Sequence, residues 1–132
     1  MNYNLLNGTN LAYIGDAYYE LRVRKHLLEK GITKNKDLMK ISINYVSATS
    51  HKMIYDKINY MFTKEENDVF LRGRNNAPSG HRKNVDKAAY VISSGLEAII
   101  GYLYLKGDLE RLDEIIASMF LAVEGEWDVY LR

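Results

Sequence analysis

The chain contains no cysteine and a single proline, Pro78, among its 132 residues. The absence of cysteine excludes disulfides, zinc–thiolate sites and thiol catalysis, and it fits a protein of a reducing compartment. No apolar run approaches the roughly 20 residues that are needed to span a bilayer. The first four residues lack the basic and then apolar pattern of a signal peptide. We therefore expect a cytoplasmic protein without a membrane partner.

The sequence also lacks an excess of charge of either sign, because 18 lysines and arginines face 17 acidic residues. Any affinity for nucleic acid must then come from a local basic patch. No GxSxG, P-loop or GxGxxG motif is present, which excludes the esterase, nucleotide-hydrolase and dinucleotide-binding sites built on them. Hydrophobic residues make up 47% and charged residues 27%, as in a typical globular protein. The length predicts one domain over residues 1–132.

The scarcity of proline, together with the lack of alternating apolar segments between turn residues, predicts an all-α fold. Thr9 or Asn10 is the expected N-cap of a first helix that Gly31 ends. Apolar residues recur in this helix at helical spacing, at Leu11, Ile14, Tyr18, Leu21 and Leu28.

Further along the chain, Thr63 and Glu66 form the pattern of a capping box. Asparagine, proline, serine and glycine gather between residues 75 and 84, which predicts a loop. Asp108 is the expected cap of a last helix that Gly125 closes. We expect helices over residues 10–30, 37–42, 44–61, 64–72, 85–106 and 109–123.

Two carboxylates stand alone in apolar segments. Asp16 is the only charged residue between residues 5 and 19, and Glu97 is the only one between residues 88 and 105. A lone carboxylate inside an apolar helix is unfavourable unless it is paired, hydrogen-bonded or bound to a metal. Gly15, Gly95 and Gly101 lie close by, and each costs a helix about 1 kcal/mol relative to alanine. These glycines indicate helices, or a ligand, that approach closely.

The two acids allow two interpretations. Each can face solvent or form an ion pair with an arginine such as Arg22. Alternatively, the two helices pack side by side, and their facing surfaces hold Asp16, Glu20 one turn later, Glu97, and Ser94 one turn earlier. An all-oxygen cluster of this kind suits a hard divalent cation such as Mg²⁺.

A basic segment precedes the helix that carries Glu97. Between residues 72 and 87 it holds Arg72, Arg74, Arg82, Lys83 and Lys87. Basic side chains on a glycine-containing loop are suited to contact phosphates, although the same composition also fits a solvated loop. Metal-binding acids beside phosphate-binding cations would point to phosphodiester chemistry. His51, by contrast, has no acid at a triad-like spacing.

Two segments resemble motifs of a known family. Residues 11–17, Leu-Ala-Tyr-Ile-Gly-Asp-Ala, resemble the signature helix of the ribonuclease III family, whose Gly-Asp-Ala holds a catalytic aspartate. Residues 94–101, Ser-Gly-Leu-Glu-Ala-Ile-Ile-Gly, resemble its second acidic helix, whose glutamate completes the magnesium site. The stretch at residues 72–75 and the length resemble the small bacterial branch, Mini-ribonuclease III, which lacks the double-stranded RNA-binding domain.

The sequence departs from the ordinary family pattern at two positions. Ala12 stands where the family has an acid one turn before its Gly-Asp, and Ser94 stands where it has an aspartate one turn before its glutamate. Two of the usual four acids are thus absent, and the number of bound metal ions stays open.

The resemblance implies a dimeric, all-α endonuclease that uses Mg²⁺ to cleave double-stranded RNA, leaves 5′-phosphates and matures the 23S ribosomal RNA precursor. Asp16 and Glu97 would be catalytic and hold the metal, with Ser94 and Glu20 supporting them. The basic residues named above would bind RNA. A second copy, and a ribosomal protein or the pre-50S particle, would be partners.

Two other interpretations stay open at this point. One is a ribonuclease III-like module that binds RNA or associates with the ribosome without cleaving. The other is a helical interaction domain that binds no nucleic acid.

Overall fold

The computed structural model describes residues 1–78 and 86–131, with side chains to residue 125, and is helical throughout apart from the connections. This confirms the expected all-α class. Two 3₁₀ helices, η1 (Tyr3–Leu5) and η2 (Asn59–Met61), accompany the α-helices. The α-helices are α1 (Gly8–Glu29), α2 (Asn35–Val46), α3 (Ala48–Ile58), α4 (Lys64–Asn75), α5 (Lys87–Lys106) and α6 (Leu109–Leu131).

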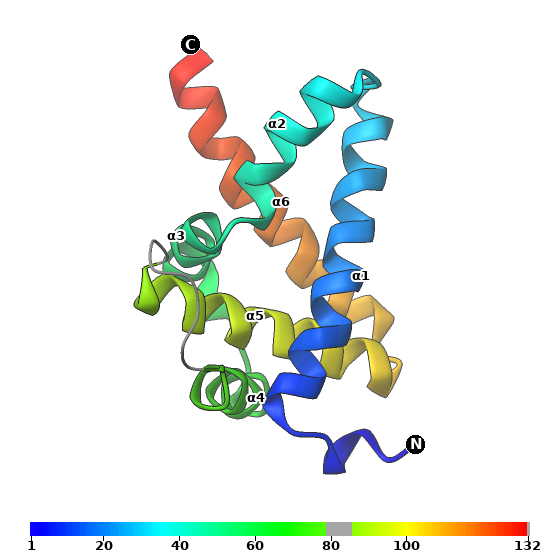
Figure 1. Cartoon of the computed structure of the whole chain (residues 1–132), viewed down its shortest axis with the longest axis vertical. Coiled ribbons are helices and arrows are strands. Elements are labelled where there is room, and N and C mark those ends of the chain that lie inside the picture. The colour runs from blue at the N-terminus through cyan, green and yellow to red at the C-terminus, as the bar shows by residue number, and fades with distance from the viewer. Residues whose placement is uncertain (79–85, 132) are drawn as a thin grey trace.

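α5 lies at the centre of the molecule, where α1, α3, α4 and α6 pack against it (Figure 1). Asp86 caps α5 by accepting a hydrogen bond from the Ala88 amide at 2.9 Å. The helix therefore begins at Lys87 rather than at Val85, the expected start. Gly107, with a φ of 84°, ends it as expected.

The composition of α5 corrects one expectation about membranes. α5 has a mean hydropathy of 1.4, and by its length and composition alone it could cross a bilayer. No segment of that kind was expected from the sequence. Inside the protein, however, 61% of this stretch is buried. A helix that is apolar on most sides is also what the core of a helical domain requires.

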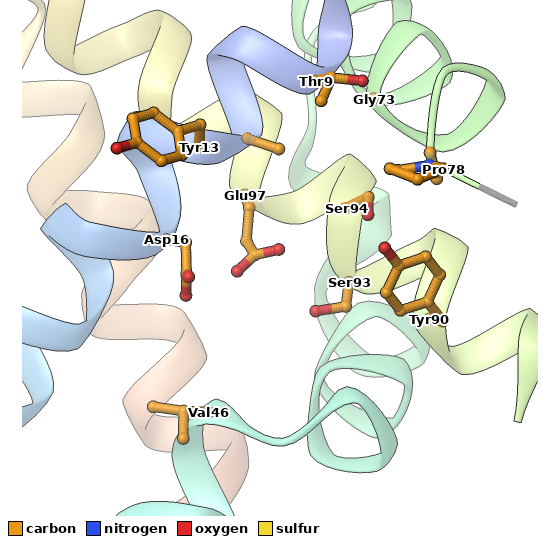
Figure 2. Close-up of a pocket in the computed structure, with 12 residues that line it drawn as sticks. Thr9, Tyr13, Asp16, Val46, Gly73, Pro78, Tyr90, Ser93, Ser94 and Glu97 are labelled. Carbon is orange, nitrogen blue, oxygen red and sulfur yellow. The ribbon is translucent and has the colours of Figure 1, made fainter. Parts of the chain in front are cut away.

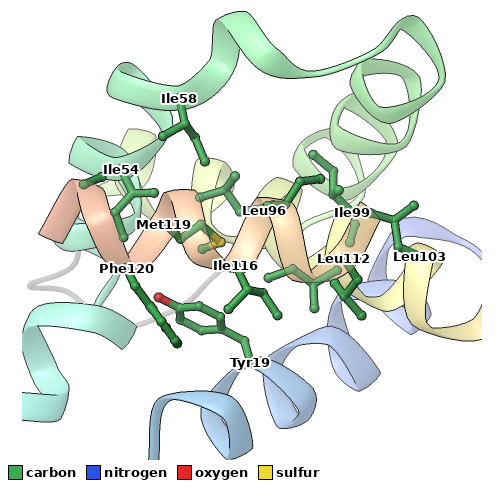
Figure 3. Close-up of a cluster of buried hydrophobic side chains, with 14 of the residues drawn as sticks. Tyr19, Ile54, Ile58, Leu96, Ile99, Leu103, Leu112, Ile116, Met119 and Phe120 are labelled. Carbon is green, nitrogen blue, oxygen red and sulfur yellow. The ribbon is translucent and has the colours of Figure 1, made fainter. Parts of the chain in front are cut away.

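The hydrophobic core lies mainly between α5 and α6, and α1 and α3 enclose it (Figure 3). Leu96 and Ile99 of α5 and Ile116 and Met119 of α6 are each at most 1% exposed. Full burial of such a side chain contributes about 1.5–3 kcal/mol. This core holds α5 in place, so that only the parts of α5 outside it can face a ligand.

The buried face of α1 differs from the expected one. Leu21 and Leu28 are 62% and 52% exposed, although both belong to the expected apolar positions. Apolar residues occur on more than one side of this helix, and the row that α5 contacts is the one that becomes buried. That row follows i, i+4 spacing through Leu11, Gly15, Tyr19, Val23 and Leu27.

The start of α1 also differs from the prediction. Asn7 is the N-cap, and its side chain accepts a hydrogen bond from the Asn10 amide at 2.8 Å. Thr9, one of the two expected caps, instead donates its hydroxyl to the Asn76 carbonyl at 2.7 Å. This bond ties the beginning of α1 to the end of α4.

The boundary between α2 and the next helix lies at Ser47, whereas the sequence suggested a boundary near residue 43. Ser47 is extended, with φ −68° and ψ 154°, and it ends α2 and caps α3 at once. Its side chain accepts a hydrogen bond from the Ser50 amide at 3.1 Å. A serine in this conformation is a favourable N-cap, which explains why the chain turns here.

The capping box of Thr63 and Glu66 is present as expected. The helix that it opens, α4, continues through Gly73 to Asn75, beyond the expected end at residue 72. Likewise, α6 runs through Gly125 to Leu131 rather than ending at residue 123. Glycine weakens a helix without ending it when the chain keeps helical dihedral angles.

Glycines allow α1 and α4 to lie unusually close to α5. A Cβ atom at Gly15 would stand 1.8 Å from the Glu97 carbonyl oxygen, and one at Gly101 would stand 1.9 Å from the Leu11 carbonyl oxygen. Carbon and oxygen atoms that are not bonded prefer roughly 3.5 Å or more, so that any side chain would push the helices apart. The close approach that the glycines around the two acids indicate is therefore confirmed.

We predict that Gly15→Ala destabilises the protein by about 2–4 kcal/mol, because the added methyl group meets a backbone carbonyl that cannot rotate away. Urea or thermal unfolding measures this change. Gly125→Ala is the matched control, since Gly125 is also helical but a Cβ atom there meets nothing within 4 Å. The control should stabilise the protein by up to about 1 kcal/mol. Similar effects of the two substitutions would contradict tight packing at Gly15.

Candidate active site

A cleft of about 520 Å³ opens between α1, the end of α4 and the first half of α5 (Figure 2). α1 contributes Asp16, and α5 contributes Ser93, Ser94 and Glu97. Gly73 at the end of α4 forms part of the wall, where its missing side chain leaves room for α5. The remaining lining residues are Thr9, Ala12, Tyr13, Val46, Ala77, Pro78 and Tyr90.

The two lone acids meet in this cleft. Figure 2 shows the side chains of Asp16 and Glu97 extending into the same space from α1 and α5. Asp16 is exposed, Glu97 is half-buried, and their carboxyl groups lie within hydrogen-bonding reach of each other. The alternative in which Arg22 neutralises either acid is wrong, because Arg22 donates to Asp113 at 2.7 Å.

The surroundings of Glu97 favour its protonated form. Burial raises the pKa of Glu97 to about 9, and the hydrogen bond to Asp16 and the charges of Asp16 and Glu20 act in the same direction. Two carboxyl groups this close cannot both ionise at low cost, so that Glu97 keeps its proton beside Asp16. A cation between them would remove the need for that proton.

This donor set fits a hard divalent cation. Carboxylate and hydroxyl oxygens line the cleft, and Mg²⁺ is commonly held by one or two carboxylates while water or phosphate oxygens complete its shell. Within residues 1–78 and 86–125, no three or more histidine, aspartate or glutamate side chains gather as a metal cluster. A cation bound here would therefore depend on Asp16, Glu97 and ligands from outside the protein.

Ser94 and Glu20, which the sequence suggested as supporting residues for Asp16 and Glu97, lie in different surroundings. Ser94 is buried and lines the cleft one turn before Glu97. Glu20 lies outside the lining of this cleft and accepts a hydrogen bond from Arg24 at 3.1 Å. Glu20 affects the site through the effect of its charge on the pKa of Glu97.

A further polar pair in the cleft wall is absent from the sequence prediction. Ser93 lines the cleft one turn before Glu97, and its Oγ lies 2.6 Å from Nδ1 of His51, which is 1% exposed. The sequence places Ser93 four residues before Glu97, on the same side of a helix, and that spacing is the signal that could have identified it.

The basic residues suggested as RNA contacts differ in their surroundings. Arg74 and Lys87 are exposed, at the end of α4 and the beginning of α5. Arg72 is half-buried, and its guanidinium donates to the Leu6 carbonyl at 3.5 Å. Arg82 and Lys83 lie outside the residues that the structure describes.

Comparison with known proteins assigns the chain to a family. A family model described as the ribonuclease III domain matches residues 9–108, a range that includes both acids. The chain belongs to the ribonuclease III family. The resemblance of the two acidic motifs is thereby confirmed, and the chain is an endoribonuclease of a family that acts on double-stranded RNA.

Relatives named Mini-ribonuclease 3 extend the match over most of the chain and confirm the expected branch of the ribonuclease III family. One from Symbiobacterium thermophilum is 45% identical over 108 residues, which cover 82% of this chain and 83% of the relative. One from Brevibacillus brevis is 42% identical over 123 residues, covering 93% and 92%. One from Streptococcus pneumoniae is 37% identical over 124 residues, covering 92% and 97%.

A solved structure supports the same fold. The crystal structure of a protein from Fusobacterium nucleatum matches 95% of this chain and 95% of its own, with a TM-score of 0.79 and 30% sequence identity. The all-helical arrangement that brings α1 and α5 together is thus shared beyond this chain.

We predict that Glu97→Gln stabilises the metal-free ribonuclease at alkaline pH. Because the pKa of Glu97 is raised to about 9 on folding, ionising it costs stability, and this cost grows as pH rises from about 4.5 to 9. A neutral glutamine removes the cost, so the variant should match the wild type near pH 4 and exceed it by about 1–3 kcal/mol near pH 9. Thermal unfolding in EDTA across this range measures the difference. A difference that does not change with pH would contradict the raised pKa of Glu97.

Proposed function

We propose that this ribonuclease III family member hydrolyses double-stranded RNA with the help of Mg²⁺ at the cleft between α1 and α5. The observation that carries the proposal is that Asp16 and Glu97 face the same open cleft, and neither acid has a cationic side chain as partner among the described residues. Such a pair is costly in the free protein, and a divalent cation would stabilise it.

In this proposal Asp16 and Glu97 hold the cation, and Glu97 loses its proton when the cation binds. Bound Mg²⁺ would act as a Lewis acid on the scissile phosphate and lower the pKa of a water molecule. The hydrolysis adds the water oxygen to phosphorus and breaks the bond between phosphorus and the 3′ oxygen. The products are a 5′-phosphate and a 3′-hydroxyl, which takes up a proton.

The described basic residues favour a path for RNA across the mouth of this cleft. Arg74 and Lys87 lie at the ends of α4 and α5, and the cleft-lining residues Gly73 and Tyr90 are their near neighbours in the sequence. Exposed cations at these positions suit the phosphates of a duplex, which a protein reads through the backbone and shape of A-form RNA. Arg82 and Lys83 stay predictions for the same surface.

We further propose a cytoplasmic homodimer whose substrate is the 23S ribosomal RNA precursor, bound free or in the pre-50S particle with its ribosomal proteins. Tyr13 and Leu21 are 83% and 62% exposed on α1, and with Ala17 between them they form an apolar stripe beside Asp16. A second copy on this stripe would bury it and relate two acidic sites by one two-fold axis, which suits the two strands of a duplex.

We predict that Asp16→Asn and Glu97→Gln each lower the cleavage rate by at least about 10³-fold, because each keeps the shape of the side chain and removes the charge that holds the cation. The assay incubates a long RNA duplex with the protein, with and without Mg²⁺, and maps the product ends. The wild type should yield 5′-phosphates only when Mg²⁺ is present. Both variants should still bind the duplex in a gel-shift assay.

Near-wild-type cleavage by either variant at saturating Mg²⁺ would remove that residue from the site. Cleavage that continues in EDTA would overturn the metal requirement. Duplex binding without cleavage by the wild type would favour the non-catalytic RNA-binding module instead.

The surface proposed for RNA is tested by the dependence of affinity on salt. Arg74→Ala combined with Lys87→Ala should weaken duplex binding and reduce the slope of log affinity against log salt by about 2, or about 1 for each lost phosphate contact. Lys64→Ala is the control, since Lys64 is an exposed cation about 15 Å from Arg74 on the same helix. The control should leave the slope unchanged. Equal slopes for the double variant and the wild type would place RNA elsewhere on the protein.

A further inference from the structure

His51 connects the interior of the protein to the wall of the acidic cleft. It lies on α3, is 1% exposed, and its Nδ1 is 2.6 Å from the Ser93 hydroxyl. Tyr19 packs its ring edge against the imidazole, with ring centroids 5.4 Å apart. Within the described part of the chain, Nε2 of His51 has no hydrogen-bond partner. The hydroxyl of Ser93 is thus the hydrogen-bond partner on which this buried imidazole depends.

The position of His51 is costly for a residue that only fills space. Burying a polar nitrogen without a partner typically costs about 1–3 kcal/mol, and an apolar side chain of similar size would avoid that cost. Burial also lowers the pKa of His51 to about 4, so that the ring is neutral at physiological pH. A neutral imidazole has one nitrogen that donates and one that accepts.

The neutral ring of His51 has two tautomers, which differ in the nitrogen that accepts. The backbone carbonyl of Tyr45 opposes the fall in the pKa of His51, although Nε2 makes no hydrogen bond within the described part of the chain. The Tyr19 hydroxyl donates to the same carbonyl at 3.0 Å and helps to fix its position. With the hydrogen on Nδ1, the ring would donate to the Ser93 oxygen; with the hydrogen on Nε2, Nδ1 accepts from the Ser93 hydroxyl.

This direction leaves the free lone pair of Ser93 Oγ on the side of the cleft. Ser93 precedes Glu97 by one helical turn and lines the same cleft, as Figure 2 shows. Thr9, another hydroxyl of the lining, already donates to the Asn76 carbonyl. An acceptor beside Glu97 suits the water molecules around a hydrated Mg²⁺ ion, because those waters donate hydrogen bonds.

We propose that Ser93 is a further ligand-positioning residue of the site, and that His51 fixes its hydroxyl so that Ser93 Oγ accepts a hydrogen bond from a water of the hydrated cation. This inference rests on the function proposed above. The fixed Ser93 hydroxyl compensates for the small number of carboxylates, because a neutral acceptor orients water without adding charge beside Asp16 and Glu97. His51 acts through Ser93 and touches neither RNA nor metal.

The first experiment titrates Mg²⁺ alone into the RNA-free protein by calorimetry. Ser93→Ala should weaken Mg²⁺ binding by about 10–100-fold, the usual effect of removing a partner that orients metal-bound groups. Ser93→Thr keeps the hydroxyl and should recover most of the affinity. Ser42→Ala is the control, since the Ser42 hydroxyl bonds the Met39 carbonyl and lines a different cavity. In cleavage assays, Ser93→Ala should lower kcat while KM for the duplex stays unchanged.

Two substitutions at His51 separate positioning from packing. His51→Asn places an amide oxygen near the position of Nδ1 and can still accept from Ser93, whereas His51→Gln places its amide near Nε2. The asparagine variant should therefore retain more Mg²⁺ affinity than the glutamine variant. In the wild type, ¹⁵N chemical shifts should show a hydrogen on Nε2 and none on Nδ1 of His51.

Asp16→Asn, measured alongside, distinguishes the two proposals. If Asp16→Asn abolishes Mg²⁺ binding while Ser93→Ala binds and cleaves like the wild type, the role of Ser93 is overturned and the function stands. If Asp16→Asn leaves Mg²⁺ binding and cleavage intact, the proposed function itself fails. If Ser93→Ala lowers the unfolding temperature in EDTA but leaves Mg²⁺ affinity and kcat unchanged, the bond to His51 is structural only, and the inference is wrong.

Discussion

The close contact between α1 and α5 is the constraint on which the site depends. The backbones meet at Gly15 and Gly101, where even a methyl group would overlap a carbonyl oxygen of the other helix. Asp16 directly follows one of these glycines, and Glu97 supplies the carbonyl that faces it. The contact that orders the helices therefore also sets the separation of the two carboxyl groups. A looser packing would give a similar fold with acids too far apart to share a cation.

The same contact makes the free protein electrostatically unfavourable at the cleft. Burial and the neighbouring Asp16 keep Glu97 protonated, and no cationic side chain of the described residues pairs with either acid, since the nearest candidate in sequence, Arg22, bonds Asp113. Elsewhere the protein pairs its buried charges well: Glu66 is 3% exposed and accepts two hydrogen bonds at 2.8 Å from Arg111. The contrast separates an ion pair that holds α4 to α6 from an acidic pair that has no cationic partner among the described residues.

The rest of the cleft follows from where the core ends. Leu96 and Ile99 of α5 are buried against α6, whereas Ser93 and Glu97, on another side of the same helix, face the cleft. α5 thus serves as a core helix and as a wall of the site at once, which explains why a helix of such high hydropathy carries a single carboxylate. Placing functional groups on a helix that the core holds on several sides limits their movement, as a positioned catalytic site requires.

The sequence by itself determined the helical class, the capping box at Thr63 and the isolation of Asp16 and Glu97 in apolar segments, because these depend on neighbouring residues and on the rarity of a charge among apolar ones. Only the tertiary structure decided which face of α1 is buried, that Asn7 and Ser47 cap helices, and that His51 meets Ser93. A sequence with apolar residues on several sides of a helix allows several packings, and the contacts of α5 select one of them. The raised pKa of Glu97 is likewise a property of the assembled cleft, since burial and the charge of a residue 81 positions away produce it together.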